Sequence, residues 1–132
     1  MNYWAILLSA LAAFVLSYVW YSAFAEQMLR LHPLSPGTPA AMMRPPAGKM
    51  LVEVVRSLIL ASVLARLVAG LGVSTWTAAA GLAVLLWIGF PFVLWTGAIM
   101  WENVPLELAA IHAGDWLLKL VLVTVIVAVW RK

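Results

Sequence analysis

The chain of 132 residues contains no cysteine, and only 10% of its residues are charged. Soluble globular domains carry about 25% charged residues, so this composition excludes that class. The lack of cysteine excludes a disulfide-stapled secreted module, a thiolate zinc site and thiol or redox chemistry of the protein's own. Apolar side chains are abundant instead: 66% of the residues are hydrophobic and eight are tryptophan. The sequence therefore indicates an integral membrane protein.

Four apolar runs are long enough to cross a bilayer, which requires about 20 residues in a helix. They are continuous blocks rich in Leu, Ala and Val, and they lack the alternation of membrane barrel strands. The runs cover residues 3–25, 50–69, 75–100 and 106–130. We therefore predict an all-α, polytopic membrane protein whose residues 1–132 form a single four-helix transmembrane domain with up-down-up-down topology.

The connections between these runs differ in length. Residues 26–49 hold five of the seven prolines, and proline stops a helix because it lacks a backbone donor. We expect a Pro-rich surface loop there, and a lid, a linker and a docking segment remain equally open. The connections at 70–74 and 101–105 are short and force antiparallel neighbours. Inside the third run, Pro91 is expected to kink the helix.

Tryptophan and tyrosine are enriched where a membrane protein meets the membrane–water interface. The expected interface residues are Trp4, Trp76 and Trp130 on one side and Trp20, Tyr21 and Trp101 on the other. Three basic residues in the Pro-rich loop, against two at the C-terminus, favour a cytoplasmic loop. We therefore expect a multi-pass protein of the cell inner (plasma) membrane with both termini outside.

Charged residues inside the predicted spans need a partner, because each costs about 2.5 to 3.5 kcal/mol on insertion scales. In the fourth run, His112, Asp115 and Lys119 fall within a wedge of about 60° on one helix face. In the second run, Glu53 and Arg56 lie one turn apart. All five residues fall in the same half of the bundle, with Lys119 roughly 20 Å along its helix from residue 106.

Two hypotheses fit this polar constellation. In the functional one, the five residues line a half-cavity that binds an anionic or zwitterionic group or relays protons, with His112 titrating near neutral pH. In the structural one, Asp115 pairs with Lys119 and Glu53 pairs with Arg56, so that buried charges are neutralised and helix register is fixed. Spacing along the chain does not separate the two.

No motif identifies a reaction. The sequence contains no Gly-rich phosphate loop, no HExxH and no GxSxG element, so we predict no catalytic residues and no cofactor. A metal site built from Glu102, Glu107, His112 and Asp115 is conceivable. We favour a solvated acidic rim for the two glutamates and predict no metal.

Small residues at four-residue spacing predict close approaches between helices. These rows are Ser9, Ala13 and Ser17, then Ala109 with Ala113, and Ala110 with Gly114; Gly89 and Gly97 lie two turns apart. Such rows allow close contacts either between helices of the bundle or between subunits.

The partners we expect are membrane lipid and a second copy of the chain or another membrane protein. No basic stripe is present, so no nucleic acid partner is expected.

Short stretches of the chain resemble a bacterial membrane protein family known as domain of unknown function 1761. The stretches are Trp20-Tyr21-Ser22 with Phe24, Trp101-Glu102-Asn103-Val104-Pro105, and Ile111-His112-Ala113-Gly114. The resemblance covers nearly the whole chain and implies a small polytopic protein, but no reaction. Ser17 stands where a glycine is expected, and Asp115 where an aromatic residue is commoner.

The function we predict combines these observations. We expect a small membrane protein, forming oligomers, whose intramembrane half-cavity binds or passes a small polar or amphipathic solute. The alternative is a structural or partner-binding subunit in which the same charges specify assembly.

Overall fold

The computed structural model describes residues 2–31 and 47–130, and no strand occurs among them. The helices are α1 (Tyr3–Ala23), α2 (Ala25–Leu31), α3 (Ala47–Leu71), α4 (Trp76–Trp87), the π-helix η2 (Ile88–Phe92), α5 (Val93–Trp101) and α6 (Leu106–Val129). Four helical segments are long and apolar enough to cross a membrane, namely Tyr3–Ala23, Ala47–Leu71, Trp76–Trp101 and Leu106–Val129. The predicted all-α fold with four spans is confirmed.

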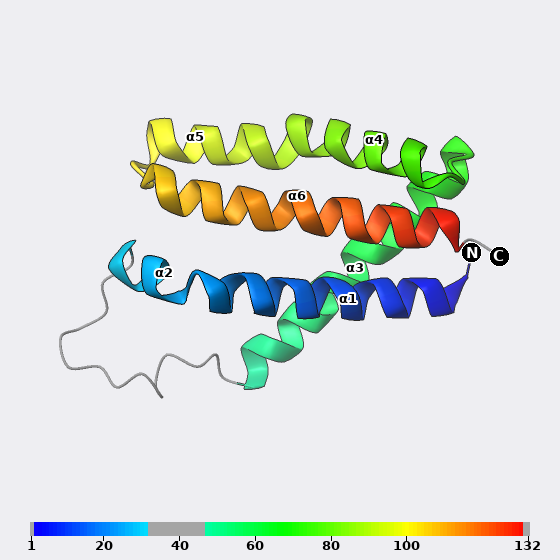
Figure 1. Cartoon of the computed structure of the whole chain (residues 1–132), viewed down its shortest axis with the longest axis horizontal. Coiled ribbons are helices and arrows are strands. Elements are labelled where there is room, and N and C mark those ends of the chain that lie inside the picture. The colour runs from blue at the N-terminus through cyan, green and yellow to red at the C-terminus, as the bar shows by residue number, and fades with distance from the viewer. Residues whose placement is uncertain (1, 32–46, 131–132) are drawn as a thin grey trace.

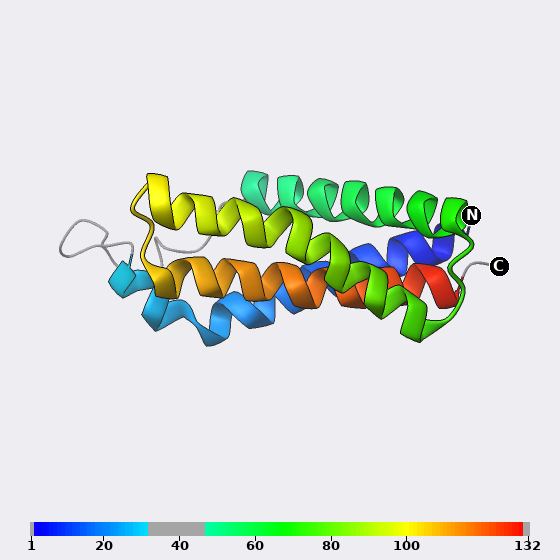
Figure 2. The same ribbon diagram turned by 90° about the horizontal axis from the view of Figure 1, so that it is seen from above.

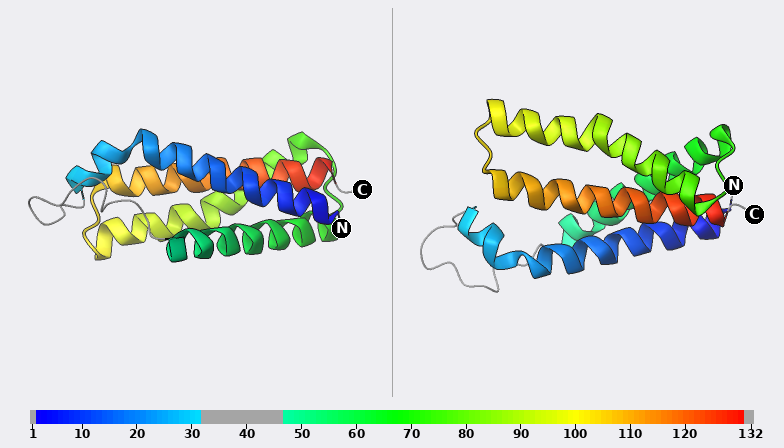
Figure 3. Two further views of the ribbon diagram at one scale, coloured as in Figure 1. Left: turned by 90° about the horizontal axis from the view of Figure 1, so that it is seen from below. Right: turned by 45° about the horizontal axis from the view of Figure 1, so that its top comes forward.

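Helix α6 is the centre of the bundle, because it packs against α1, α3, α4 and α5. The four spans alternate in direction, and α1 begins at the end of the molecule where α6 finishes (Figure 1). α1 and α6 run side by side, whereas α3 crosses both at an oblique angle (Figures 1 and 3). Side chains on different faces of α6 therefore meet different helices.

The first helix begins and ends at well-defined residues. The Asn2 side chain accepts hydrogen bonds from the backbone N–H groups of Trp4 and Ala5, which caps the helix. The chain leaves helical geometry at Phe24 alone and continues as α2. Residues 26–31 and 47–49, which we expected in the Pro-rich loop, are helical, because the prolines of that segment run only from Pro33 to Pro46. The five prolines of the predicted loop lie outside the described residues, so the role of the loop stays a prediction.

The third span is interrupted at the predicted position. Pro91 lies within the π-helix η2, and the helix axis changes direction between α4 and α5 (Figure 2). Proline lacks an N–H donor and its ring displaces the carbonyl one turn earlier, so a wider turn relieves the clash. The expected kink is confirmed.

The core of the bundle is rich in alanine, which packs there with larger residues such as Leu64 and Leu120. Its buried alanines are Ala10, Ala13, Ala61, Ala65, Ala79, Ala83 and Ala128. Large apolar residues such as Leu7, Ile59 and Leu94 are exposed instead. Small residues inside and large apolar residues outside suit a helical protein surrounded by lipid, where packing rather than water exclusion holds helices together.

Candidate functional site

Asp115 is the most buried charged residue of the described chain, with 1% of its surface exposed. Its Oδ2 lies 3.1 Å from Lys119 Nζ on the same helix. The Ser17 hydroxyl of α1 donates to its Oδ1 at 2.7 Å, and the Tyr21 hydroxyl lies 3.5 Å from Oδ2. Both carboxylate oxygens therefore have partners, which a buried charge requires.

His112 lies one turn before Asp115 and contacts two other helices. Its Nδ1 is hydrogen-bonded to the Tyr21 hydroxyl at 2.7 Å. The Trp95 ring of α5 stacks on the imidazole, with 4.7 Å between centroids and 8° between planes. The imidazole is thus held between α1 and α5.

Two indoles anchor the same turn of α6 from different sides. Trp20 Nε1 donates to the Ile111 carbonyl and Trp87 Nε1 donates to the Ala113 carbonyl, both at 2.8 Å. The Trp20 ring lies directly over Gly114, where an added Cβ would stand 2.8 Å from Trp20 Cζ2. Glycine is therefore required for this approach of α1 to α6.

The contacts described so far form one continuous region between α1 and α6, which we call the α1–α6 seam. It comprises Ser17, Trp20 and Tyr21 with Ile111, His112, Gly114 and Asp115.

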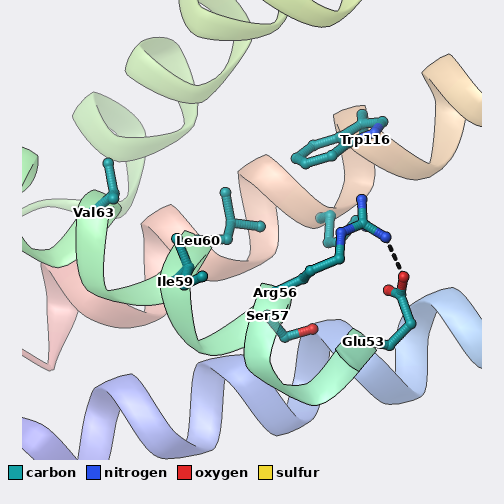
Figure 4. Close-up of a pocket in the computed structure, with 8 residues that line it drawn as sticks. Glu53, Arg56, Ser57, Ile59, Leu60, Val63 and Trp116 are labelled. Atoms are coloured by element: carbon teal, nitrogen blue, oxygen red, sulfur yellow. Dashed lines mark hydrogen bonds and ion pairs between the residues drawn. The ribbon is translucent and has the colours of Figure 1, made fainter. Parts of the chain in front are cut away.

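On another side of α6, Glu53 and Arg56 of α3 form a hydrogen-bonded ion pair. Their side chains are 43% and 55% exposed, respectively. The pair stands at one end of an open groove between α3 and α6, with a volume of about 290 Å³. We call this the α3–α6 groove; its lining residues are Glu53, Arg56, Ser57, Ile59, Leu60, Val63, Trp116 and Lys119 (Figure 4).

Lys119 belongs to both regions. Its ammonium pairs with Asp115 in the seam and lies 4.4 Å from the centroid of the Trp116 ring, within reach of a cation–π interaction. The same side chain lines the groove. Since Asp115 is not among the lining residues, the groove is lined by two cations, Arg56 and Lys119, and one anion, Glu53.

The structure divides the five candidate residues into two groups. His112 and Asp115 lie in the seam, Glu53 and Arg56 lie in the groove, and Lys119 touches both. Both ion pairs that the spacing suggests are formed. Sequence reasoning missed Ser17 and Tyr21 as partners of Asp115. Their four-residue separation places them on one face of α1 and was the available signal.

The expected interface aromatics differ in their surroundings. Four are exposed: Trp4, Trp76, Trp101 and Trp130. Trp20 and Tyr21 are half-buried and hydrogen-bond to α6. Glu102 and Glu107 are exposed, and within residues 2–31 and 47–130 no three His, Cys, Asp or Glu side chains are grouped to hold a metal ion.

Comparison with known proteins gives one match. The sequence model of the family described as "Protein of unknown function (DUF1761)" matches residues 4–128. No curated protein and no solved structure matches the chain. The match spans all four helices that are suited to crossing a membrane. The chain therefore belongs to the DUF1761 family of proteins of unknown function.

Proposed function

We propose that this small membrane protein binds an amphipathic molecule from the bilayer in the α3–α6 groove. The observation that carries the proposal is the composition of the groove, which joins a charged end at Glu53, Arg56 and Lys119 to an apolar wall at Ile59, Leu60 and Val63. A molecule with a polar head and an apolar tail matches both parts at once.

The depth of the groove supports entry from the bilayer. Lys119 stands roughly 20 Å along α6 from Leu106, near the middle of that helix. Ile59 and Val63 are 58% and 57% exposed, so the groove opens sideways among side chains that face lipid. A lipid-soluble molecule reaches such a position directly. A strictly water-soluble solute would first have to cross part of the hydrocarbon layer.

In this proposal the seam has a supporting role. Asp115 has partners on both oxygens, so it has little capacity left for a ligand. By pairing with the Lys119 ammonium, it fixes the conformation of a side chain that lines the groove. The buried pair thus positions a binding residue and joins α1 to α6.

The test is to fill the groove with a large side chain. We expect Val63→Trp to abolish saturable binding of single-chain amphiphiles, here oleic acid and lysophosphatidylcholine, measured by native mass spectrometry of the detergent-solubilised protein. Val52→Trp is the matched control, because Val52 lies on the same helix, is 55% exposed and does not line the groove. Equal binding by the two variants, or no saturable binding to the unmodified protein, would contradict the proposal.

A second candidate, a subunit that docks onto another membrane protein or a second copy of itself, is favoured by α5. That helix buries none of its residues within the chain, and Gly97 has open space where a Cβ would stand. We expect Gly97→Ile to dissociate such an oligomer, whereas Gly81→Ile, also at an open glycine, should leave it intact. Native mass spectrometry distinguishes the two results, and a monomeric unmodified protein would argue against self-assembly.

A further inference from the structure

We infer that the occupant of the α3–α6 groove is a single-chain amphipathic anion, a free fatty acid whose carboxylate lies between Arg56 and Lys119. This inference rests on the proposed function and adds the chemistry of the ligand. Three properties of the groove support it: the charge of its lining, its hydrogen-bond donors and its size.

Two of the side chains that line the groove are cationic and one is anionic. Arg56 and Lys119 face it together with Glu53 alone, while the carboxylate of Asp115 is enclosed in the seam. Lys119 is only 7% exposed, so its charge is poorly hydrated. Because Asp115 already neutralises Lys119, an anionic ligand gains from hydrogen bonds to this poorly hydrated ammonium and to Arg56, which a ligand without acceptor oxygens does not make.

The donors of the two cations match a carboxylate. A lysine ammonium has three N–H donors, of which Asp115 Oδ2 takes one. An arginine guanidinium has five, and its Nη1 also bonds Glu53. A carboxylate only accepts hydrogen bonds, and its two oxygens offer acceptors enough for donors of both cations. Figure 4 shows Arg56 extending from α3 toward Trp116 on α6, across the polar end of the groove.

The size of the groove favours one chain. Its volume of about 290 Å³ is at the lower limit of ordinary ligand pockets, about 300 to 1,000 Å³. From Arg56 to Val63 the apolar wall extends about 10 Å along α3. The upper part of one acyl chain fits along that wall and its end continues into the bilayer. A two-chain phospholipid would need space for a second chain and a larger head group.

The experiment uses the full chain in nanodiscs and two photoreactive probes of equal chain length, a diazirine-bearing fatty acid and the corresponding fatty alcohol. We expect the acid to cross-link within residues 53–63 and 116–119, and to bind at least about tenfold more tightly than the alcohol, since charge-assisted hydrogen bonds are lost with the alcohol. Peptide mapping and saturation curves give both quantities.

Three variants test the role of charge without removing the buried Asp115–Lys119 pair. Arg56→Gln should weaken binding of the acid about tenfold, and Glu53→Gln should strengthen it, because Arg56 then lacks the carboxylate that competes with the ligand for its donors. Arg66→Gln is the matched control: Arg66 is also an exposed arginine of α3, but it does not line the groove, so binding should not change. None of the three should change binding of the alcohol.

The outcomes separate the two proposals. Equal binding of acid and alcohol in the groove would overturn the fatty-acid assignment and leave the proposed function standing. If phosphatidylglycerol displaces the labelled acid more effectively than unlabelled fatty acid does, the fatty-acid assignment would also be overturned, and the ligand would be a two-chain lipid. Cross-linking of neither probe within the groove would overturn both the assignment and the proposed function.

Discussion

The α1–α6 seam and the α3–α6 groove border the same helix and each contains an acid–base pair within one helix. Asp115 and Lys119 are separated by four residues and their side chains are 2% and 9% exposed. Glu53 and Arg56 are separated by three, and their side chains are 43% and 55% exposed. Nearly identical spacings in the sequence therefore give one buried pair and one exposed pair. The exposure of each pair depends on the helix that packs against it.

The two environments imply different energetics. Removing one member of a buried pair leaves a charge without a partner and costs about 3 to 5 kcal/mol, whereas an exposed pair contributes about 0 to 1 kcal/mol. The Asp115–Lys119 pair should therefore control stability, while the exposed Glu53–Arg56 pair can be changed with little effect on the fold. Each of the following predictions tests this contrast.

The largest effect is expected for Asp115→Leu. This change leaves the Lys119 ammonium without its buried counter-ion and Ser17 without its acceptor, so unfolding should become easier by about 3 kcal/mol or more. Denaturation by SDS in mixed micelles measures the free energy of unfolding.

The matched double variant, Asp115→Leu with Lys119→Leu, should recover most of that loss, because it removes both charges together. A single variant as stable as the unmodified protein would show that the seam does not depend on the pair. A double variant as unstable as the single one would assign the loss to Ser17 and Tyr21 instead.

A smaller effect is expected for Gly114→Ala. The added methyl group would overlap the Trp20 ring, which its bond to Ile111 holds in place, so the cost should be about 1 to 3 kcal/mol. Gly97→Ala is the control: nothing lies within 4 Å of the added Cβ, and alanine favours a helix over glycine by about 0.5 to 1 kcal/mol. The same denaturation experiment should give opposite signs, and equal effects would contradict a close contact at Gly114.

Two buried or half-buried serines of α1 give a finer comparison. Ser17 donates to the charged Asp115, whereas Ser9 donates to the Ile6 carbonyl of its own helix. We expect Ser17→Ala to cost about 1.5 kcal/mol, the lower limit for hydrogen bonds to charged groups, and Ser9→Ala to cost less. No measurable loss for Ser17→Ala would mean that the carboxylate does not need the Ser17 hydroxyl.

The smallest effect is expected in the groove. Glu53→Gln breaks a largely exposed pair, so the free energy of unfolding should change by less than about 1 kcal/mol. A loss as large as that of Asp115→Leu, in the same measurement, would remove the distinction between the two regions.

The sequence was sufficient to predict the four spans and the kink at Pro91, and it offered the two ion pairs as one of two open hypotheses, because each depends on residues close together in the chain. The helical residues 26–31 were not predicted, since a Pro-rich loop was assigned from composition without weighing where its first proline stands. Ser17, Trp20 and Tyr21 were not recognised as partners of α6. The pairing of helix faces between α1 and α6 depends on contacts between residues about 90 positions apart, such as that of Trp20 with Gly114. Local periodicity does not specify such distant contacts.

The central claim is that α6 packs closely against α1, whereas a ligand can reach α6 in the groove beside α3. Because the chain has no cysteine, single cysteines report access directly, and we would compare Leu60→Cys in the groove with Ala13→Cys, at a fully buried position of α1. With a bilayer-soluble maleimide, we predict rapid labelling of the Leu60→Cys variant that oleic acid slows, and negligible labelling of the Ala13→Cys variant. Equal labelling of the two, or labelling of Leu60→Cys that oleic acid does not change, would contradict the account.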